Sequence, residues 1–417
     1  MMDIAKVVDS VFRHEHGRVL SILISVLGDF DLAEDALQET LVTALERWPR
    51  DGVPDNPAAW IVTVGRRKAI DRLRREKNLG RKTALLAEPL ATSFAEPDMT
   101  DETAIPDERL KLIFTCCHPA LSPEARVALT LRTLGGLTTA EIAHAFLVPV
   151  PTMNQRLTRA KTKIRGAAIP YVVPSVETIP ERLDGVLNVL YLIFNEGYAA
   201  SAGDDLIRRE LCAEAIRLAL TLVTLLESRP ELGPQPEALG LTALLLLHDS
   251  RRPARTDEDG ELILLEDQDR ELWDHPQIDA GIALLERAMV VRRPGPYQLQ
   301  AAIAALHAQA PTAAETDWPQ IALLYDRLWQ YTPSPVVKLN RAVAVGMARG
   351  PLAGLALMQA PELAEALDGY HWYHAAVADF LRRAGYREAA RAAYVRALAL
   401  CENRAERSFL GRRIAEL

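Results

Sequence analysis

The run from Trp60 to Lys82 constrains this chain more than any other feature, because an apolar stripe gives way within a few residues to a dense cationic face. Between Arg66 and Lys82 nine bases stand against two acids. The whole chain has a formal charge of −8, so solubility does not require such a block. Lysine and arginine at this density displace counterions from nucleic acid, which predicts a helix over about 57–77 that contacts phosphates. A solvated helix face is the plain alternative.

Composition favours helices packed on helices. Hydrophobic residues make up 49% of the 417 residues, but aromatic residues only 6%. We expect no signal peptide, and the longest apolar stretch, Leu239–Leu247, is too short to cross a bilayer. The four cysteines make no disulfide framework. These features predict an all-α cytoplasmic protein without a membrane partner.

Charge is shared unevenly along the chain. Residues 1–170 hold 23 Lys and Arg against 22 Asp and Glu, a net of +1. Residues 171–417 hold 25 against 34, a net of −9, and the two parts sum to the formal −8. Nucleic-acid binding is therefore expected in the first 170 residues.

An amphipathic helix is predicted from Asp29 to Trp48. Asp31 can cap it, with Glu34 three residues on as in a capping box. Pro49 is expected to end this helix, and the Gly- and Pro-containing segment 50–57 to form a loop.

Residues 83–106 are of another kind, with five acids, no base and three prolines. This composition predicts an extended or disordered tether. Helical patterns resume at Asp107, so the tether joins two helical units.

A helix-turn-helix is predicted between Ser122 and Arg165. Ser122 can cap a helix that ends at Leu134, and Thr138 with Glu141 forms a capping box. The next helix, PTMNQRLTRAKTKIR, carries five bases and no acid. A basic second helix after a short turn is typical of insertion into the DNA major groove.

The remainder alternates helical stretches with turns. Gly385, Ala390, Tyr394 and Ala397 fall at the spacing of a tetratricopeptide unit. Such helical pairs stack and leave a concave binding surface.

With these motifs in view, the chain resembles a bacterial extracytoplasmic-function sigma factor, of the branch with a long C-terminal extension of tetratricopeptide-like repeats. The resemblance is carried by DLAEDALQET, AWIVTVGRRKAIDRLRR, and GGLTTAEIAHAF through RLTRAKTKIR. In the tail it is softer, resting on NEGYAAS, HDSRRPAR and LLEDQDRELWD. It implies a first sigma domain over 1–82, a linker over 83–106, a second sigma domain over 107–170 and a helical extension over 171–417.

The resemblance also implies partners and site residues. RNA polymerase core would be bound by the acidic face of the first motif, at Asp31, Glu34, Asp35, Gln38 and Glu39. The minus-ten promoter DNA would be contacted by Asp55, Asn56, Trp60, Arg66, Arg67, Lys68, Arg72, Arg74 and Arg75. The minus-thirty-five element would be read by Thr152, Met153, Asn154, Gln155 and Arg156, with phosphate contacts from Thr158, Arg159, Lys161 and Lys163. Pro149 and Pro151 replace the Ser and Gly common in the family, which stiffens this turn.

No catalytic, cofactor or metal site is predicted. Cys116 and Cys117 are adjacent and cannot easily supply the spaced ligands of a tetrahedral metal site. His371 and His374 lack the carboxylate–histidine spacing of a zincin.

The predicted function is promoter-specific initiation of transcription by a non-enzymatic sigma subunit. Its C-terminal body would regulate it, through the other domains of the chain, a protein partner or a ligand. Two alternatives stay open: a helix-turn-helix regulator that acts without polymerase, and a metabolite-sensing tail fused to a sigma module.

Overall fold

The computed structural model describes residues 4–83, 108–146, 148–198, 209–257 and 261–417. In these residues the secondary structure is helical, with one isolated bridge between Thr256 and Leu262. The chain divides into two compact units, Met1–Val189 and Leu190–Leu417. The all-α prediction is confirmed. The predicted tether, apart from Thr83, lies outside the described residues.

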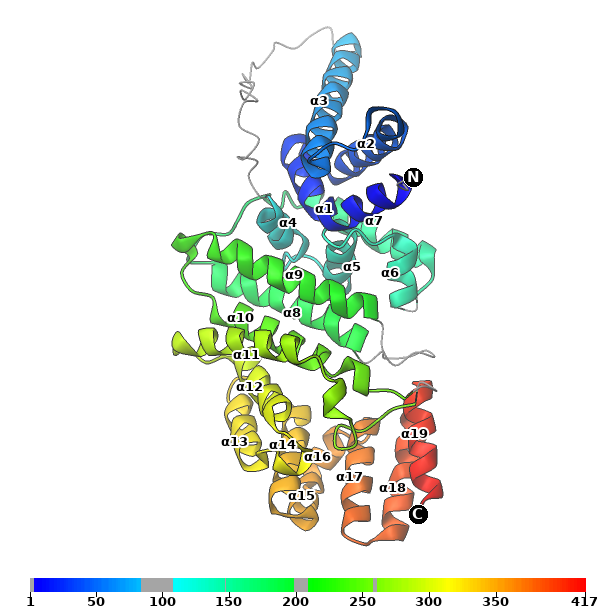
Figure 1. The fold of residues 1–417 in the computed structure, drawn as a ribbon, viewed down its shortest axis with the longest axis vertical. Helices are drawn as coiled ribbons and strands as arrows, with labels where there is room; N and C mark the ends of the chain where they lie inside the picture. The colour runs from blue at the N-terminus through cyan, green and yellow to red at the C-terminus, as the bar shows by residue number, and fades with distance from the viewer. Residues whose placement is uncertain (1–3, 84–107, 147, 199–208, 258–260) are drawn as a thin grey trace. The chain divides into compact units, whose positions relative to one another are not determined.

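The first unit begins with three helices that pack on one another: α1 (Ile4–Leu27), α2 (Phe30–Asp51) and α3 (Pro57–Thr83) (Figure 1). Leu23, Leu37 and Ile61 are fully buried between them. A Cβ added at Gly65 would lie 3.3 Å from the Thr40 hydroxyl, so glycine lets α3 approach α2 closely.

The start and end of α2 differ from the prediction. Asp29 rather than Asp31 is the N-cap, and its carboxylate accepts hydrogen bonds from the backbone N–H groups of Asp31 and Leu32. Gly28, with φ of +68°, makes the preceding turn and so decides which aspartate caps. Pro49 lies inside α2, which continues to Asp51, so the lost N–H bond and the steric demand of the ring fall in the last turn and do not end the helix before it.

The second group of helices contains the predicted helix-turn-helix. It comprises α4 (Arg109–Cys116), α5 (Pro123–Thr133), α6 (Thr139–Ala145) and α7 (Val150–Gly166). The Ser122 hydroxyl caps α5, and Thr138 and Glu141 exchange hydrogen bonds at the start of α6, so both predicted caps are confirmed. Pro149 is the N-cap of α7, with its backbone extended at φ −60° and ψ 140°.

Residues after α7 lead into α8 (Ile179–Tyr198), whose first half belongs to the first unit. Its Arg182 donates a hydrogen bond to the carbonyl of Phe114, at 2.7 Å. A bond from the end of α4 to α8 ties this first half of α8 to the helix-turn-helix.

Over its described residues, 190–198, 209–257 and 261–417, the second unit continues from α8 through eleven α-helices in chain order. These are α9 (Arg209–Glu227), α10 (Pro236–Asp249), α11 (His275–Val290), α12 (Pro296–Gln309), α13 (Trp318–Trp329), α14 (Pro335–Arg349), α15 (Pro351–Met358), α16 (Pro361–Ala366), α17 (His371–Arg383), α18 (Arg387–Leu400) and α19 (Arg404–Ala415). Most of these helices pack on a neighbour in sequence (Figure 1).

Two elements of the second unit show how it packs. Helix α10 is buried on almost every side, because α9, α11 and α12 all pack against it. Helices α17 and α18 form the hairpin that the sequence pattern indicates: Gly385, with φ of +85°, makes the turn, and Ala390, Tyr394 and Ala397 are buried. The assignment of this hairpin to the tetratricopeptide class stays a prediction.

Candidate functional site

The acidic face predicted to bind polymerase lies on α2. Asp31, Asp35, Gln38 and Glu39 are exposed there, and Glu34 is half-buried. The same face continues with two exposed apolar side chains, Val42 at 54% and Leu45 at 46%. Positions 35, 38, 42 and 45 recur at spacings of three and four, so they share one face of the helix. Sequence reasoning missed Val42 and Leu45, because apolar residues of an amphipathic helix are expected inside.

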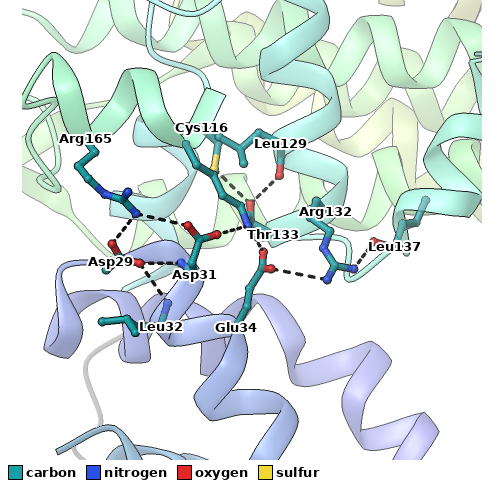
Figure 2. Close-up of polar contacts among 11 residues, drawn as sticks. Asp29, Asp31, Leu32, Glu34, Cys116, Leu129, Arg132, Thr133, Leu137 and Arg165 are labelled. Atoms are coloured by element: carbon teal, nitrogen blue, oxygen red, sulfur yellow. Dashed lines mark hydrogen bonds and ion pairs between the residues drawn. The ribbon is translucent and has the colours of Figure 1, made fainter. Parts of the chain in front are cut away.

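Bases of α5 and α7 cover one end of this acidic face (Figure 2). The Lys161 Nζ lies 2.9 Å from Asp31 Oδ1 and 3.1 Å from Glu34 Oε1. The Arg165 Nη2 lies 2.6 Å from Asp29 Oδ2 and 3.3 Å from Asp31 Oδ2. Arg132 of α5 reaches Glu34 at 3.6 Å. We call these six residues the α2–α7 ion-pair cluster.

Solvent access divides the cluster into a sheltered and an open part. The side chains of Lys161 and Glu34 are only 12% and 17% exposed, whereas those of Arg165 and Asp31 are 61% and 58% exposed. Burial acts to raise the pKa of Asp29, but hydrogen bonds from the backbone of Leu32 and Asp31 and the charge of Arg165 together lower it. The sheltered Lys161–Glu34 pair is screened least by salt.

Uncharged contacts bring the same two helical groups together. A Cβ added at Gly17 of α1 would meet the carbonyl oxygen of Leu134 at 2.9 Å, which only glycine tolerates without a shift. Gly136, with φ of +69°, lies against the ring of His16. The Tyr171 hydroxyl donates to the carbonyl of Ser21, at 2.9 Å. The contact of α1 and α2 with the helix-turn-helix is therefore steric as well as electrostatic.

The residues predicted to contact minus-ten DNA lie just before α3 and along it. Asp55 and Asn56 are exposed, and the Asn56 side chain accepts a hydrogen bond from the N–H of Ala59, so it caps the helix. Trp60 packs edge-on against buried Trp48, with ring centroids 5.5 Å apart. This contact gives Trp60 a packing role.

The predicted bases of α3 are only partly described. Arg67 is exposed, and Arg66 and Lys68 are half-buried. The helix runs to Thr83, beyond the predicted end at Lys77. The side chains of Arg72, Arg74 and Arg75 lie outside the described residues.

The predicted reading helix α7 exposes most of the expected residues. Thr152, Asn154, Gln155, Thr158, Arg159 and Lys163 are exposed, and Arg156 is half-buried. Met153 is fully buried with Leu157 and Ala160 in the hydrophobic face of α7, so it cannot reach a base edge. Thr158, Arg159 and Lys163 line a shallow open depression, whereas Lys161 points to α2.

Cys116 and Cys117 are buried in the packing between helices. Cys116 Sγ lies 3.1 Å from the Thr133 hydroxyl (Figure 2). Cys117 Sγ lies 3.6 Å from the hydroxyl of Thr130. Burial raises the pKa of the Cys117 thiol to about 11, so it stays protonated at neutral pH. Sequence reasoning could not have found the hydroxyl partners, since they come from the neighbouring helix.

Comparisons with known proteins agree with this arrangement. Residues 11–79 match the model for sigma-70 region 2, residues 111–164 match sigma-70 region 4, and residues 182–289 match a family of unknown function, DUF6596. No solved structure matches the chain. Among the described residues, no helix is long and apolar enough to span a bilayer.

Two kinds of relative are found. A Rhizobium meliloti protein described as uncharacterized is 44% identical over 398 residues, which cover 94% of this chain and 92% of that protein. The ECF RNA polymerase sigma factors SigK of Mycobacterium ulcerans and Mycobacterium tuberculosis are each 27% identical over 159 residues, 37% of this chain and 82% of theirs.

A regulator that consisted of a helix-turn-helix alone would not match sigma-70 region 2, as this chain does. The SigK proteins match only 37% of this chain, and the second unit accounts for the additional length. Helices α1–α3 carry region 2, helices α4–α7 carry region 4, and α8–α19 form the extension. The chain belongs to the extracytoplasmic-function sigma factors of the sigma-70 family, in a branch with a long helical C-terminal extension.

Proposed function

We propose that this sigma factor docks on core RNA polymerase through the exposed face of α2 and contacts promoter DNA through α3 and α7, acting in the cytoplasm. The docking face comprises Asp31, Glu34, Asp35, Gln38, Glu39, Val42 and Leu45. Its chemistry supports this role, because charged groups around exposed apolar side chains suit a specific protein interface. No catalysed reaction is assigned to the chain.

The proposed promoter contacts divide into contacts with base edges, contacts with phosphates and contacts with the minus-ten region. Asn154, Gln155 and Arg156 would reach base edges from the first turns of α7, and Thr158, Arg159 and Lys163 would hold phosphates. Asp55, Asn56 and the bases Arg66, Arg67, Lys68, Arg72, Arg74 and Arg75 would contact the minus-ten region.

The α2–α7 ion-pair cluster carries the second part of the proposal, which is that the free chain is closed. Lys161 and Arg165 lie against Asp31 and Glu34, two of the side chains assigned to polymerase docking. Region 4 shelters Glu34 and pairs its bases with the exposed Asp31, so polymerase must displace Lys161 and Arg165 to pair with these carboxylates. Docking therefore requires region 4 to move away from α2. The same movement frees the bases of region 4 to contact DNA.

Transcription with purified components tests the docking face. Core polymerase with this chain should start transcripts at specific promoters, and core alone should not. Replacing Asp35 and Leu45 by lysine should weaken core binding at least about tenfold, because two central contacts of the face are lost. Arg47→Glu, an exposed change on α2 outside the helical spacing of the face, is the control. Equal core binding by the double variant and the wild type would refute the assignment of this face.

The C-terminal extension is proposed to regulate the sigma domains through a protein or ligand partner. Its support is the run of paired helices in the second unit and the net charge of −9 over residues 171–417. Removing the extension and measuring promoter-directed transcription tests this role. Unchanged activity and unchanged inducibility in cells would refute it.

A further inference from the structure

Three potential metal ligands from different helices converge in the second unit. His371 is the first residue of α17, Cys401 follows the last residue of α18, and Glu406 lies in the first turn of α19. The Glu406 Oε2 lies 3.0 Å from His371 Nε2 and 3.5 Å from Cys401 Sγ. All three ligand atoms lie within 4.8 Å of one another.

Two of these separations are close to those of a tetrahedral zinc site, and the third, between His371 and Cys401, is at most 4.8 Å. With Zn–N and Zn–O bonds of about 2.1 Å and a Zn–S bond of about 2.3 Å, tetrahedral angles place N and O about 3.4 Å apart, and S and O about 3.6 Å apart. The observed 3.0 Å and 3.5 Å differ from these by a few tenths of an ångström. Small side-chain rotations would bring the three atoms around one ion.

The surroundings hold two of the ligands in place. The Asn403 side chain accepts hydrogen bonds from the N–H groups of Ala405 and Glu406, which fixes the first turn of α19. The Arg407 guanidinium donates to the carbonyl of Cys401 at 2.7 Å, which fixes the end of α18. Support of this kind orients ligand side chains before an ion arrives.

Burial and charge also suit a divalent ion. Cys401 and Glu406 are 3% and 6% exposed, whereas the His371 side chain is 22% exposed and leaves a path to solvent. A divalent cation would replace the thiol proton, and one thiolate with one carboxylate would balance its charge. Two arginines interact electrostatically with the ligand residues: Arg255 with Glu406, and Arg407 with Cys401.

We propose that His371, Cys401 and Glu406 bind a transition-metal ion of the Zn²⁺ class. Thiolate and imidazole select zinc and its neighbours over magnesium and calcium, which prefer oxygen ligands. His374, one turn further along α17, lies 2.7 Å from the carbonyl oxygen of Asp368 and is engaged there. The fourth position is thus left to water or a small ligand, and the bound ion joins the ends of α17, α18 and α19.

Cobalt spectroscopy on the reduced full-length chain tests this proposal. Co²⁺ should bind one per chain, with a thiolate-to-cobalt charge-transfer band and the intense visible bands of tetrahedral cobalt, and Zn²⁺ should abolish both. Cys401→Ser should remove the charge-transfer band. Glu406→Gln, which keeps the shape of the side chain, should weaken Zn²⁺ binding more than about 100-fold, beyond the 10–100-fold typical of losing an outer-shell partner.

Cys212→Ser is the matched control. Cys212 is also a buried cysteine of the second unit, but it lies on α9 against the carbonyl of Phe194. This variant should keep the charge-transfer band. Absence of that band in the wild-type chain would overturn the proposal, as would its persistence in the Cys401→Ser variant. Because the wild-type spectrum decides the matter by itself, a variant that fails to fold does not obscure the result.

Discussion

Removing the two α7 bases of the ion-pair cluster should strengthen binding to core polymerase. The variant is Lys161→Met with Arg165→Met, which takes away the positive charges that cover Asp31 and Glu34 but leaves both acids intact. If these bases instead supported docking, the same change would weaken binding. The direction of the effect therefore separates a masked docking face from an open one.

The structure sets the magnitude. Lys161 makes two ion pairs near 3 Å, and its side chain is 12% exposed, so it should contribute about 1 kcal/mol to the closed form. Arg165 is 61% exposed, and its pairs should contribute about 0.5 kcal/mol. A loss of about 1.5 kcal/mol shifts the closed-to-open equilibrium about tenfold, and core affinity rises by up to the same factor where the closed form dominates.

The assay is a binding titration of core polymerase without DNA, at one fixed salt concentration. Lys163→Met is the matched control, since it removes the same charge from an exposed position of α7 outside the ion-pair cluster. Gly17→Ala is an independent route to the open form, because its methyl group would clash with the backbone of Leu134. Affinity that is unchanged or lower in both the double variant and Gly17→Ala would refute the masking argument.

Three further outcomes are expected. Gly346→Ala should destabilise the second unit by about 2 kcal/mol or more, because the new Cβ would lie 2.2 Å from the ring of Phe380. Gly411→Ala in α19 has open space around it and should stabilise the unit by up to about 1 kcal/mol. Chemical denaturation measures both free energies of unfolding, and equal values for the two variants would contradict this prediction. Burial lowers the pKa of His307 to about 4, so between pH 6.5 and 4 the unfolded state takes up a proton that the folded state does not. The protection of α12 amides from hydrogen exchange should therefore fall over this range, by up to about 3 kcal/mol. The fall should be smaller in His307→Phe, and an equal fall in both proteins would contradict the assignment. Arg159→Ala should weaken holoenzyme binding to all promoters alike and reduce the slope of log affinity against log salt by about one, and a loss confined to one promoter would instead indicate base reading.

The helix-turn-helix could be predicted because its signals are local. Ser122 and the Thr138–Glu141 box act within one turn of helix, so a short window of sequence contains every partner. The same reasoning misplaced the α2 cap, because Asp29 and Asp31 have equal chemistry and the φ of Gly28 decides between them. Met153 was misassigned for a related reason: a position near the start of a reading helix can face the protein as easily as the DNA.

The α2–α7 ion-pair cluster and the metal ligands lay beyond local reasoning. Lys161 and Asp31 are 130 residues apart in sequence, and no short pattern joins them. His371 was considered only with its near neighbour His374, although its partners Cys401 and Glu406 stand at the ends of two later helices. Sites assembled by tertiary packing from helix ends carry no fixed sequence spacing, so they emerge only when the fold is known.

In the proposed mechanism, Lys161 and Arg165 link polymerase docking to promoter binding. In the closed form these bases are paired with carboxylates of α2, and in the open form they join the other cations of α7 that face DNA phosphates. Polymerase and region 4 compete for the acids of α2, while DNA and α2 compete for the bases of α7. Each ligand thus favours the open form, and by thermodynamic reciprocity docking on polymerase raises affinity for DNA by the factor by which DNA raises affinity for polymerase. Coupling of this kind would restrain the basic helices of the free chain from binding DNA until polymerase is present.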